Sequence, residues 1–255
     1  MMTRYQIELT HGPDYKLDIG WAYRLYAALL DQLPSEQARQ IHEAAVPPLG
    51  QFLKREADRW IWEIGLLGEQ GEQFLGPILE RTMSYALKDG AQEVRAKILQ
   101  KEAIADLEEL LSIGRANGTE HQFYFHTPTA FKSKGVYLSL PTTRLLLQSL
   151  VKKWNGNFPE YQIEDTDGEG LDALSHGLSI NWFSLRSRRF WLKGREITGF
   201  AGKMVLENKN KGFHWELVNA LLYFAQFSGI GVKTALGMGG VEYYGNGKEE
   251  TSAPR

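Results

Sequence analysis

Hydrophobic residues in the first hundred positions follow two different periods. Several stretches alternate apolar and polar residues, which is typical of half-buried strands, and the segments between them repeat apolar residues every three or four positions, as amphipathic helices do. The pattern predicts strands over residues 3–10, 50–56, 59–67 and 92–104, and helices over residues 20–33, 35–45 and 71–85. If the two adjacent helices count as one, the order of elements is β-α-β-β-α-β.

The second half of the chain repeats this order, although its first two predicted strands have only a short connection between them. The pattern predicts strands over residues 120–127, 135–140, 178–192, 196–206 and 235–244, and helices over residues 142–154 and 213–227. Two of the strands should form a hairpin that turns near Lys193 and Gly194. We therefore predict an α+β fold of two tandem ferredoxin-like βαββαβ domains, residues 1–115 and 116–255, joined around residues 107–118.

Composition excludes several classes of protein. The 255 residues are 43% hydrophobic and 24% charged, which suits one large or two small globular domains. There is no cysteine, so disulfides, zinc ribbons, iron–sulfur sites and thiol nucleophiles are excluded. No apolar run reaches the ~18–20 residues of a membrane helix, and the first residues lack a secretory apolar region. We expect a cytoplasmic protein without a membrane partner.

The charge distribution is uneven, although the net charge is only −2. Residues 178–233 carry nine basic residues against three acidic ones. An acidic segment precedes them, with Glu160, Glu164, Asp165, Asp167, Glu169 and Asp172. A local surplus of positive charge is typical of a phosphate-binding surface. A solvated face balanced by the acidic segment explains the same charges equally well.

A glycine-rich segment lies close to the C-terminus, with five glycines in residues 229–240 and Lys233-Thr234 at its centre. It is not a nucleotide-binding loop of either common kind. Val232 stands where a Walker A loop needs glycine, and Thr234 stands where the dinucleotide fingerprint needs its third glycine. The predicted order of helix, glycines and strand is also the reverse of both. The segment is either a backbone site for phosphate or a helix cap followed by a bulged strand.

Four stretches together point to a family. They are Ile41-His42-Glu43 followed by Pro47-Pro48-Leu49, then residues 127–132, residues 198–202 and residues 229–240. In this order they resemble the CRISPR repeat-processing endoribonucleases of the RAMP superfamily. The resemblance spans nearly the whole chain and implies two ferredoxin-like, RRM-like domains side by side. It also implies metal-independent cleavage of precursor CRISPR RNA within its repeats, without a cofactor.

The implied chemistry is attack of a 2′-hydroxyl on the adjacent phosphate, which leaves a 2′,3′-cyclic phosphate and a 5′-hydroxyl. The resemblance makes His42 the catalytic candidate, because an imidazole can act as base or acid near neutral pH. The family's companion tyrosine and lysine are replaced here by Leu30 and Pro48. Tyr26, one turn before Leu30, and Lys54 are the candidate substitutes, with Arg55 as an alternative to Lys54.

The RNA contacts are expected in the second half of the chain. The candidates are Lys132, Arg186, Arg188, Lys203, Gly229, Gly231, Lys233, Thr234, Gly237 and Gly239. Strand alternation places Arg186 and Arg188 on one face and Arg189 on the other. Trp182, Phe183, Phe190 and Trp191 are candidates for base stacking, although we expect at least half of them in the core.

Two other functions remain open. The expected partner is CRISPR repeat RNA, bound by a monomer or a homodimer. The first alternative is a non-catalytic RAMP subunit that binds crRNA in a CRISPR effector complex, since the glycine-rich segment suits both roles. The second is a generic RRM-like RNA-binding protein, which lacks support because the chain has no aromatic RNP-type strand motif.

Overall fold

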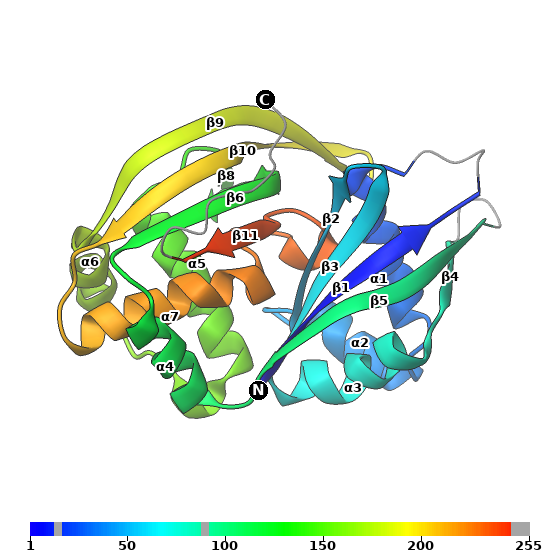
Figure 1. Cartoon of the computed structure of the whole chain (residues 1–255), viewed down its shortest axis with the longest axis horizontal. Coiled ribbons are helices and arrows are strands. Elements are labelled where there is room, and N and C mark those ends of the chain that lie inside the picture. The colour runs from blue at the N-terminus through cyan, green and yellow to red at the C-terminus, as the bar shows by residue number, and fades with distance from the viewer. Residues whose placement is uncertain (13–16, 88–91, 246–255) are drawn as a thin grey trace.

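Two antiparallel sheets, each with helices packed on one face, make up the described part of the chain, residues 1–12, 17–87 and 92–245 of the computed structural model (Figure 1). The first sheet has the order β2-β3-β1-β5-β4. Its strands are β1 (Met2–Thr10), β2 (Leu49–Glu56), β3 (Arg59–Leu67), β4 (Ser84–Leu87) and β5 (Gln92–Ile104). Its helices are η1 (Ile19–Trp21), α1 (Ala22–Leu30), α2 (Ser35–Glu43) and α3 (Gly68–Arg81). We call this sheet and these helices the N-terminal unit.

The second sheet has the order β11-β6-β10-β9. Its strands are β6 (Glu120–Thr129), β9 (Leu178–Leu192), β10 (Arg195–Asn208) and β11 (Val241–Tyr244). The helices of this C-terminal unit are α5 (Thr143–Asn157), η2 (Pro159–Tyr161), α6 (Glu169–His176), α7 (Phe213–Ser228) and η3 (Thr234–Leu236). A small hairpin of β7 (Phe131–Ser133) and β8 (Val136–Leu138) lies beside it. Both sheets have the strand order of a ferredoxin-like fold, with β4 added at one edge, so the predicted fold is confirmed.

Some predicted elements differ from the observed ones. The helix predicted to reach residue 85 ends at Arg81, and Tyr85 and Leu87 then point inward from strand β4. The strand predicted over 235–244 is only Val241–Tyr244, because η3 precedes it. The acidic segment contains helix α6, whose first N–H groups at Gly170 and Leu171 donate to the Asp165 carboxylate at 2.9 and 3.0 Å. Capping of this helix therefore accounts for Asp165 in the acidic segment.

The junction between the two halves is itself a helix, α4 (Leu107–Ala116), capped by Asp106, which accepts a hydrogen bond from the Glu109 N–H at 2.9 Å. The predicted boundary after residue 115 falls in the last turn of this helix. That division of the chain therefore stays a prediction. Within the described residues, none of the helices is long and apolar enough to cross a membrane.

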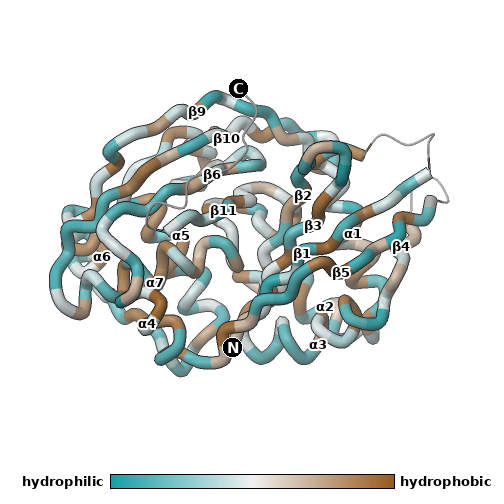
Figure 2. The backbone as a smooth tube through the Cα atoms, viewed as in Figure 1, coloured by the Kyte–Doolittle hydropathy of each residue, from teal (hydrophilic) through white to brown (hydrophobic). Residues whose placement is uncertain are grey.

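The two units share their hydrophobic cores. Met2, Leu67 and Ile104 pack in the core of the C-terminal unit, and Ala235 packs in the core of the N-terminal unit. The end of α7 lies directly on the first sheet: a Cβ added at Gly65 would lie 2.1 Å from the carbonyl oxygen of Phe227. Figure 2 shows hydrophobic positions where α4 and α7 meet, and hydrophilic ones along much of β9. The seam between the units is therefore a packed interior rather than an open hinge.

Candidate nucleic-acid interface

The β9–β10 hairpin presents two arginines without an ion-pair partner in the described part of the chain. Arg186 pairs with Ala201 and Arg188 with Gly199, so both guanidinium groups stand beside small residues on one face. Arg189 lies on the opposite face, where its Nε is 3.3 Å from a Glu196 carboxylate oxygen. The predicted separation of Arg186 and Arg188 from Arg189 is confirmed.

The same face continues across the sheet with a lysine and aromatic rings. Lys203 on β10 lies opposite Tyr124 on β6, with its Nζ 5.8 Å from the centre of the tyrosine ring. Trp182 on β9 is 50% exposed and shares the face. We call Trp182, Arg186, Arg188, Lys203 and Tyr124 the cationic face. The other face of the sheet, with residues such as Met204, packs against α5 and α7. Cations interleaved with aromatic rings suit a nucleic-acid strand.

The four aromatic residues of β9 do not divide as expected. Phe190 is buried, whereas Trp182, Phe183 and Trp191 are 50%, 63% and 64% exposed. The prediction that at least half lie in the core is wrong. The reason is that β9 is an edge strand, and only its end near Phe190 is covered by the segment before α1.

Most of the glycine-rich segment cannot offer its backbone to phosphate. The N–H groups of Gly229, Gly231 and Gly239 donate to the Ala225 carbonyl, the Ser149 hydroxyl and the Pro128 carbonyl. Six more N–H groups of the segment donate hydrogen bonds to acceptors within the protein. They belong to Ile230, Val232, Leu236, Gly237, Met238 and Gly240. Because these donors are already engaged, they are not available to a phosphate.

The glycines are instead required by close packing. A Cβ at Gly231 would lie 2.3 Å from the Ala130 carbonyl oxygen, and one at Gly237 would lie 2.5 Å from the Cβ of Ala22. Gly229, Gly231, Gly237 and Gly239 all have positive φ. Close packing is therefore one role that the structure shows for these four glycines and for buried Thr234, and their contact with RNA stays a prediction.

Two of the predicted lysine contacts are at the surface. Lys233 is exposed at the turn of the glycine-rich segment, with φ 59°. Lys132 is exposed on the small β7–β8 hairpin, where its Nζ lies 5.7 Å from the ring centre of Tyr137. Both lysines stay candidates for RNA contacts.

A buried lysine holds the glycine-rich segment in place. Lys153 on α5 donates from Nζ to the Gly231 carbonyl at 2.8 Å and to the Ser149 hydroxyl at 3.0 Å. Burial lowers the pKa of Lys153 to about 7. Sequence reasoning missed this residue. The available signal was its helical spacing of three from Leu150, which places a lysine on the apolar face of α5.

His42 is exposed in the last turn of α2. The loop that follows it packs on the end of α5, since a Cβ at Gly156 would lie 2.6 Å from the Cβ of Val46. The histidine is therefore at the surface, next to the seam between the two units.

The proposed companions of His42 are not at the surface with it. Tyr26 is buried in the core of the N-terminal unit, and burial raises its pKa to about 12. Lys54 has a side chain only 3% exposed, and its Nζ lies 2.7 Å from Glu56 and 2.9 Å from Glu63, and also contacts Glu242. The structure thus replaces both expectations: Tyr26 is a core residue, and Lys54 is the centre of an internal ion network.

That network joins the two sheets. The second carboxylate oxygen of Glu242, on β11, contacts His126 Nε2 at 2.9 Å and accepts a hydrogen bond from the Tyr244 hydroxyl at 2.7 Å. Burial alone would lower the pKa of Lys54, but the charges of Glu63 and Glu242 raise it above its usual range. Burial alone would raise the pKa of Glu242, but His126 and Lys54 hold it far below its usual range. Both groups are therefore charged at neutral pH.

Sequence reasoning could have found one member of this network. Glu63 is the single charged residue between Trp60 and Leu67, within a strand that is otherwise apolar. A lone carboxylate there requires a buried cation as partner. Among residues 1–12, 17–87 and 92–245, no three His, Asp or Glu side chains gather in an arrangement that could hold a metal ion.

Comparison with known proteins places the chain in a family. The model of the family described as CRISPR-associated endoribonuclease Cas6 matches residues 123–241. The CRISPR-associated endoribonuclease Cas6 of Streptococcus thermophilus is 32% identical over 228 residues, which cover 87% of this chain and 90% of that protein. The chain belongs to the Cas6 family. The Cas6 of Mycobacterium tuberculosis is 25% identical over 236 residues, covering 91% of this chain and 74% of that protein.

Solved structures agree with the Cas6 fold. A Cas6 product complex superposes with a TM-score of 0.75 at 20% identity, over 96% of this chain and all of that chain. Thermus thermophilus Cas6 superposes with a TM-score of 0.69 at 24% identity, over 96% of this chain and 98% of that chain. The family model begins in β6 and ends in β11, so it covers the cationic face but not His42.

Proposed function

We propose that this chain is a repeat-specific endoribonuclease that cleaves precursor CRISPR RNA without a metal ion. The observation that carries the proposal is the cationic face in a member of the Cas6 family. Arg186 and Arg188 have no carboxylate partner in the described residues, so they are free to neutralise phosphate. The exposed aromatic ring of Trp182 beside them supplies a surface on which bases stack.

The proposed chemistry starts from the RNA itself. The 2′-hydroxyl attacks the adjacent phosphorus, the bond to the 5′-oxygen breaks, and a 2′,3′-cyclic phosphate and a 5′-hydroxyl result. His42 transfers one of the two protons, as the base for the 2′-hydroxyl or the acid for the 5′-oxygen. Because Tyr26 and Lys54 are internal, we propose that groups positioned by the RNA complete the site with His42.

The test of the mechanism uses the repeat RNA of the chain's own locus in EDTA. The expected result is cleavage at one site with a cyclic phosphate end, and no cleavage when the nucleotide before that phosphate is 2′-deoxy. A requirement for Mg²⁺, or cleavage of the deoxy substrate, would overturn the mechanism. End groups are identified by mass spectrometry.

The role of His42 is tested by separating binding from cleavage. His42→Ala should reduce single-turnover cleavage by about 10²–10⁴-fold, the range for general acid–base catalysis, with little change in RNA affinity. His214→Ala is the matched control, because His214 is also exposed but begins α7 in the other unit. Full activity of His42→Ala would move the active site elsewhere. A joint loss of binding and cleavage would make His42 a structural residue.

A second function is favoured by one observation. Leu30 and Pro48 stand where the family resemblance leads one to expect a tyrosine and a lysine, and both are buried. A chain without these groups suits a non-catalytic subunit that holds crRNA in a CRISPR effector complex. The unmodified protein would then bind repeat RNA tightly and leave it intact under every condition of the cleavage test.

A further inference from the structure

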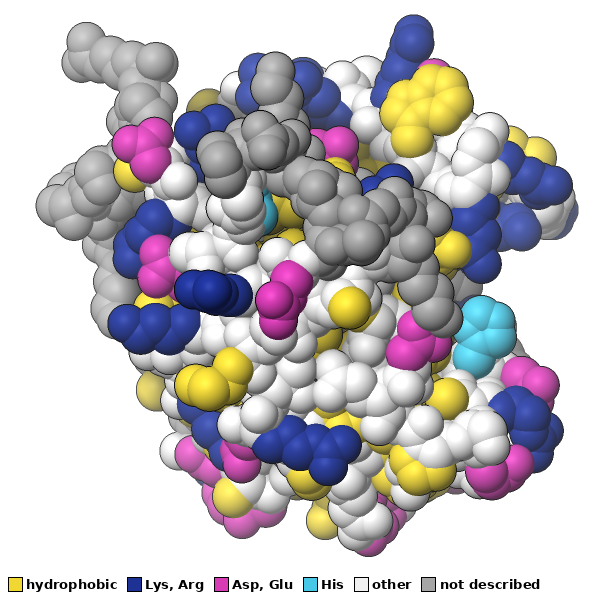
Figure 3. Space-filling model, turned by 90° about the vertical axis from the view of Figure 1, so that its right-hand side faces the viewer, with side chains coloured by type: hydrophobic (Ala, Val, Ile, Leu, Met, Phe, Trp, Pro, Cys, Tyr) yellow, Lys and Arg dark blue, Asp and Glu magenta, His cyan; other side chains and the backbone are white. Residues whose placement is uncertain are grey.

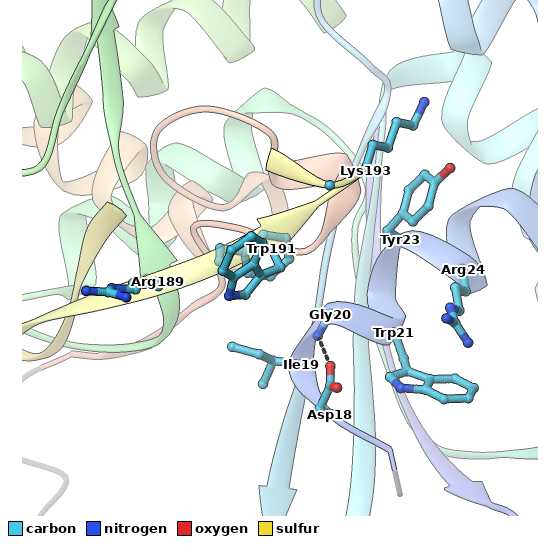
Figure 4. Close-up of a pocket in the computed structure, with 11 residues that line it drawn as sticks. Asp18, Ile19, Gly20, Trp21, Tyr23, Arg24, Arg189, Trp191 and Lys193 are labelled. Carbon is cyan, nitrogen blue, oxygen red and sulfur yellow. Dashed lines mark hydrogen bonds between the residues drawn. The ribbon is translucent and has the colours of Figure 1, made fainter. Parts of the chain in front are cut away.

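A pocket of about 530 Å³ opens between the tip of the β9–β10 hairpin and the segment that leads into α1 (Figure 4). One wall is the hairpin around Trp191, and the other is η1 with the first turn of α1, from Asp18 to Arg24. Its size lies within the range of about 300–1,000 Å³ found for pockets that bind small ligands. No sequence motif indicated it, because its walls belong to different units.

The charge of the pocket suits an anion. Its lining includes the cations Arg24, Arg189 and Lys193 and a single carboxylate, Asp18, and Arg189 is itself paired with Glu196 at 3.3 Å. One oxygen of Asp18 already accepts a hydrogen bond from the Gly20 N–H at 2.6 Å. Figure 3, a side view, shows several basic side chains together near the upper right edge, next to an exposed hydrophobic group, whereas basic, acidic and hydrophobic side chains are mixed in the lower half.

The aromatic rings of the pocket suit a planar group. Trp191 is 64% exposed and projects from β9 toward the opposite wall (Figure 4). The Arg24 guanidinium lies 4.5 Å from the ring centre of Trp21, and the Lys193 Nζ lies 5.3 Å from that of Tyr23. Aromatic rings that alternate with cations are the usual platform for the bases and phosphates of a single strand.

The two walls are held together from beneath. Phe190 is buried in a small cluster with Met238 and Ala130, and Ile19 and Tyr23 pack against that cluster. A ligand therefore meets a preformed pocket and has little protein to order on binding, which favours affinity.

We propose that this pocket binds one unpaired nucleotide of the repeat RNA, with its base stacked on Trp191 and its phosphate beside Lys193. The inference rests on the proposed function, because it takes RNA as the ligand. Arg188 lies three residues from Trp191 on β9, about 10 Å along the strand. Since β9 is the edge strand, one RNA chain can cross from the cationic face into the pocket.

The experiment replaces single bases of the repeat RNA with 2-aminopurine, whose fluorescence falls when it stacks. The unmodified protein should quench one unpaired position, and Trp191→Ala should restore emission there. The same substitution should weaken RNA binding by about 5- to 150-fold, the range for loss of one stacked base. Trp191→Phe should keep the quenching. Phe213→Ala is the matched control, because Phe213 is 61% exposed at the far end of the C-terminal unit.

The outcomes separate the two proposals. Binding of the RNA with no position whose emission depends on Trp191 overturns the pocket and leaves the endoribonuclease intact. Absence of RNA binding by the unmodified protein overturns both. A parallel titration with adenosine monophosphate tests whether the pocket binds free nucleotides instead of RNA. Saturable binding of the mononucleotide, together with no RNA position whose emission depends on Trp191, also overturns the proposal.

Discussion

Replacing Gly239 by alanine tests whether the glycine-rich segment serves packing or RNA. The added Cβ would lie 1.9 Å from the carbonyl oxygen of Ile230, and the backbone there has φ 66°. Gly239 also accepts a hydrogen bond from the Ile230 N–H at 2.9 Å and donates one to the Pro128 carbonyl at 3.0 Å. The backbone cannot relieve the clash without moving these bonds.

The expected loss of stability is the sum of three contributions. A non-glycine residue in the left-handed region costs about 1–2 kcal/mol. Overpacking of a closed interior costs about 1–3 kcal/mol, and one displaced hydrogen bond costs about 1 kcal/mol. Gly239→Ala should therefore lower the free energy of unfolding by about 3–6 kcal/mol, a large part of the ~5–15 kcal/mol typical of a folded protein.

Gly194→Ala is the matched control. Gly194 has φ 74° at the hairpin tip, but a Cβ there has open space, so only the backbone cost of about 1–2 kcal/mol applies. Urea unfolding followed by tryptophan fluorescence measures the stability of both variants, and the RNA affinity of folded Gly239→Ala is compared with that of the unmodified protein, because Gly194 lines the proposed pocket. If Gly239→Ala unfolds within about 1 kcal/mol of Gly194→Ala but loses RNA affinity tenfold, the packing argument is refuted and the segment contacts RNA.

Three further predictions concern buried charge and surface charge. Lys54→Met should lower the free energy of unfolding by about 3–5 kcal/mol in urea, because its buried carboxylate partners lose their cation; a loss below about 1 kcal/mol would mean that water screens the network. Burial lowers the pKa of His121 from about 6.5 in the unfolded chain to about 4 in the folded protein. The free energy of unfolding should therefore be fully retained above pH ~6.5 and fall by up to about 3 kcal/mol as the pH drops toward 4. His121→Asn should flatten that pH dependence, and equal slopes in both proteins would contradict it. Arg186→Ala and Arg188→Ala should each reduce the slope of log affinity against log salt by about 0.7, whereas Lys211→Ala, three residues after the end of β10, should not; equal slopes in all three would place the RNA on another surface.

The hydrophobic pattern predicted strands such as β1 and β6 well because burial alternates along them, with one face in the core. The hairpin of β9 and β10 is an example: its turn at Lys193 and Gly194 was visible in the sequence, and so was the separation of Arg188 from Arg189. Element ends were less predictable. The pattern of α3 continues into β4 without a break, since Tyr85 suits a buried position in either structure.

The candidate site was harder to predict because it depends on contacts between the two halves. The sequence pattern suggests that the side chain of Lys54 is exposed. In the structure it is buried, and Glu242, 188 positions away, neutralises its charge. The glycines were correctly singled out, but their purpose depends on which backbone lies against them. No local pattern shows that Gly231 lies against Ala130 or that Lys153 donates a hydrogen bond to the carbonyl group of Gly231.

The exchange of core residues between the units has a consequence during synthesis. Strands β1 to β5 leave the ribosome long before Ala235, which completes the core beneath them, and before Phe227, which covers Gly65. The nascent N-terminal half must therefore expose part of its apolar surface until nearly the whole chain has been made. Cutting the chain at residue 115 would leave each fragment without part of the core that the other half supplies.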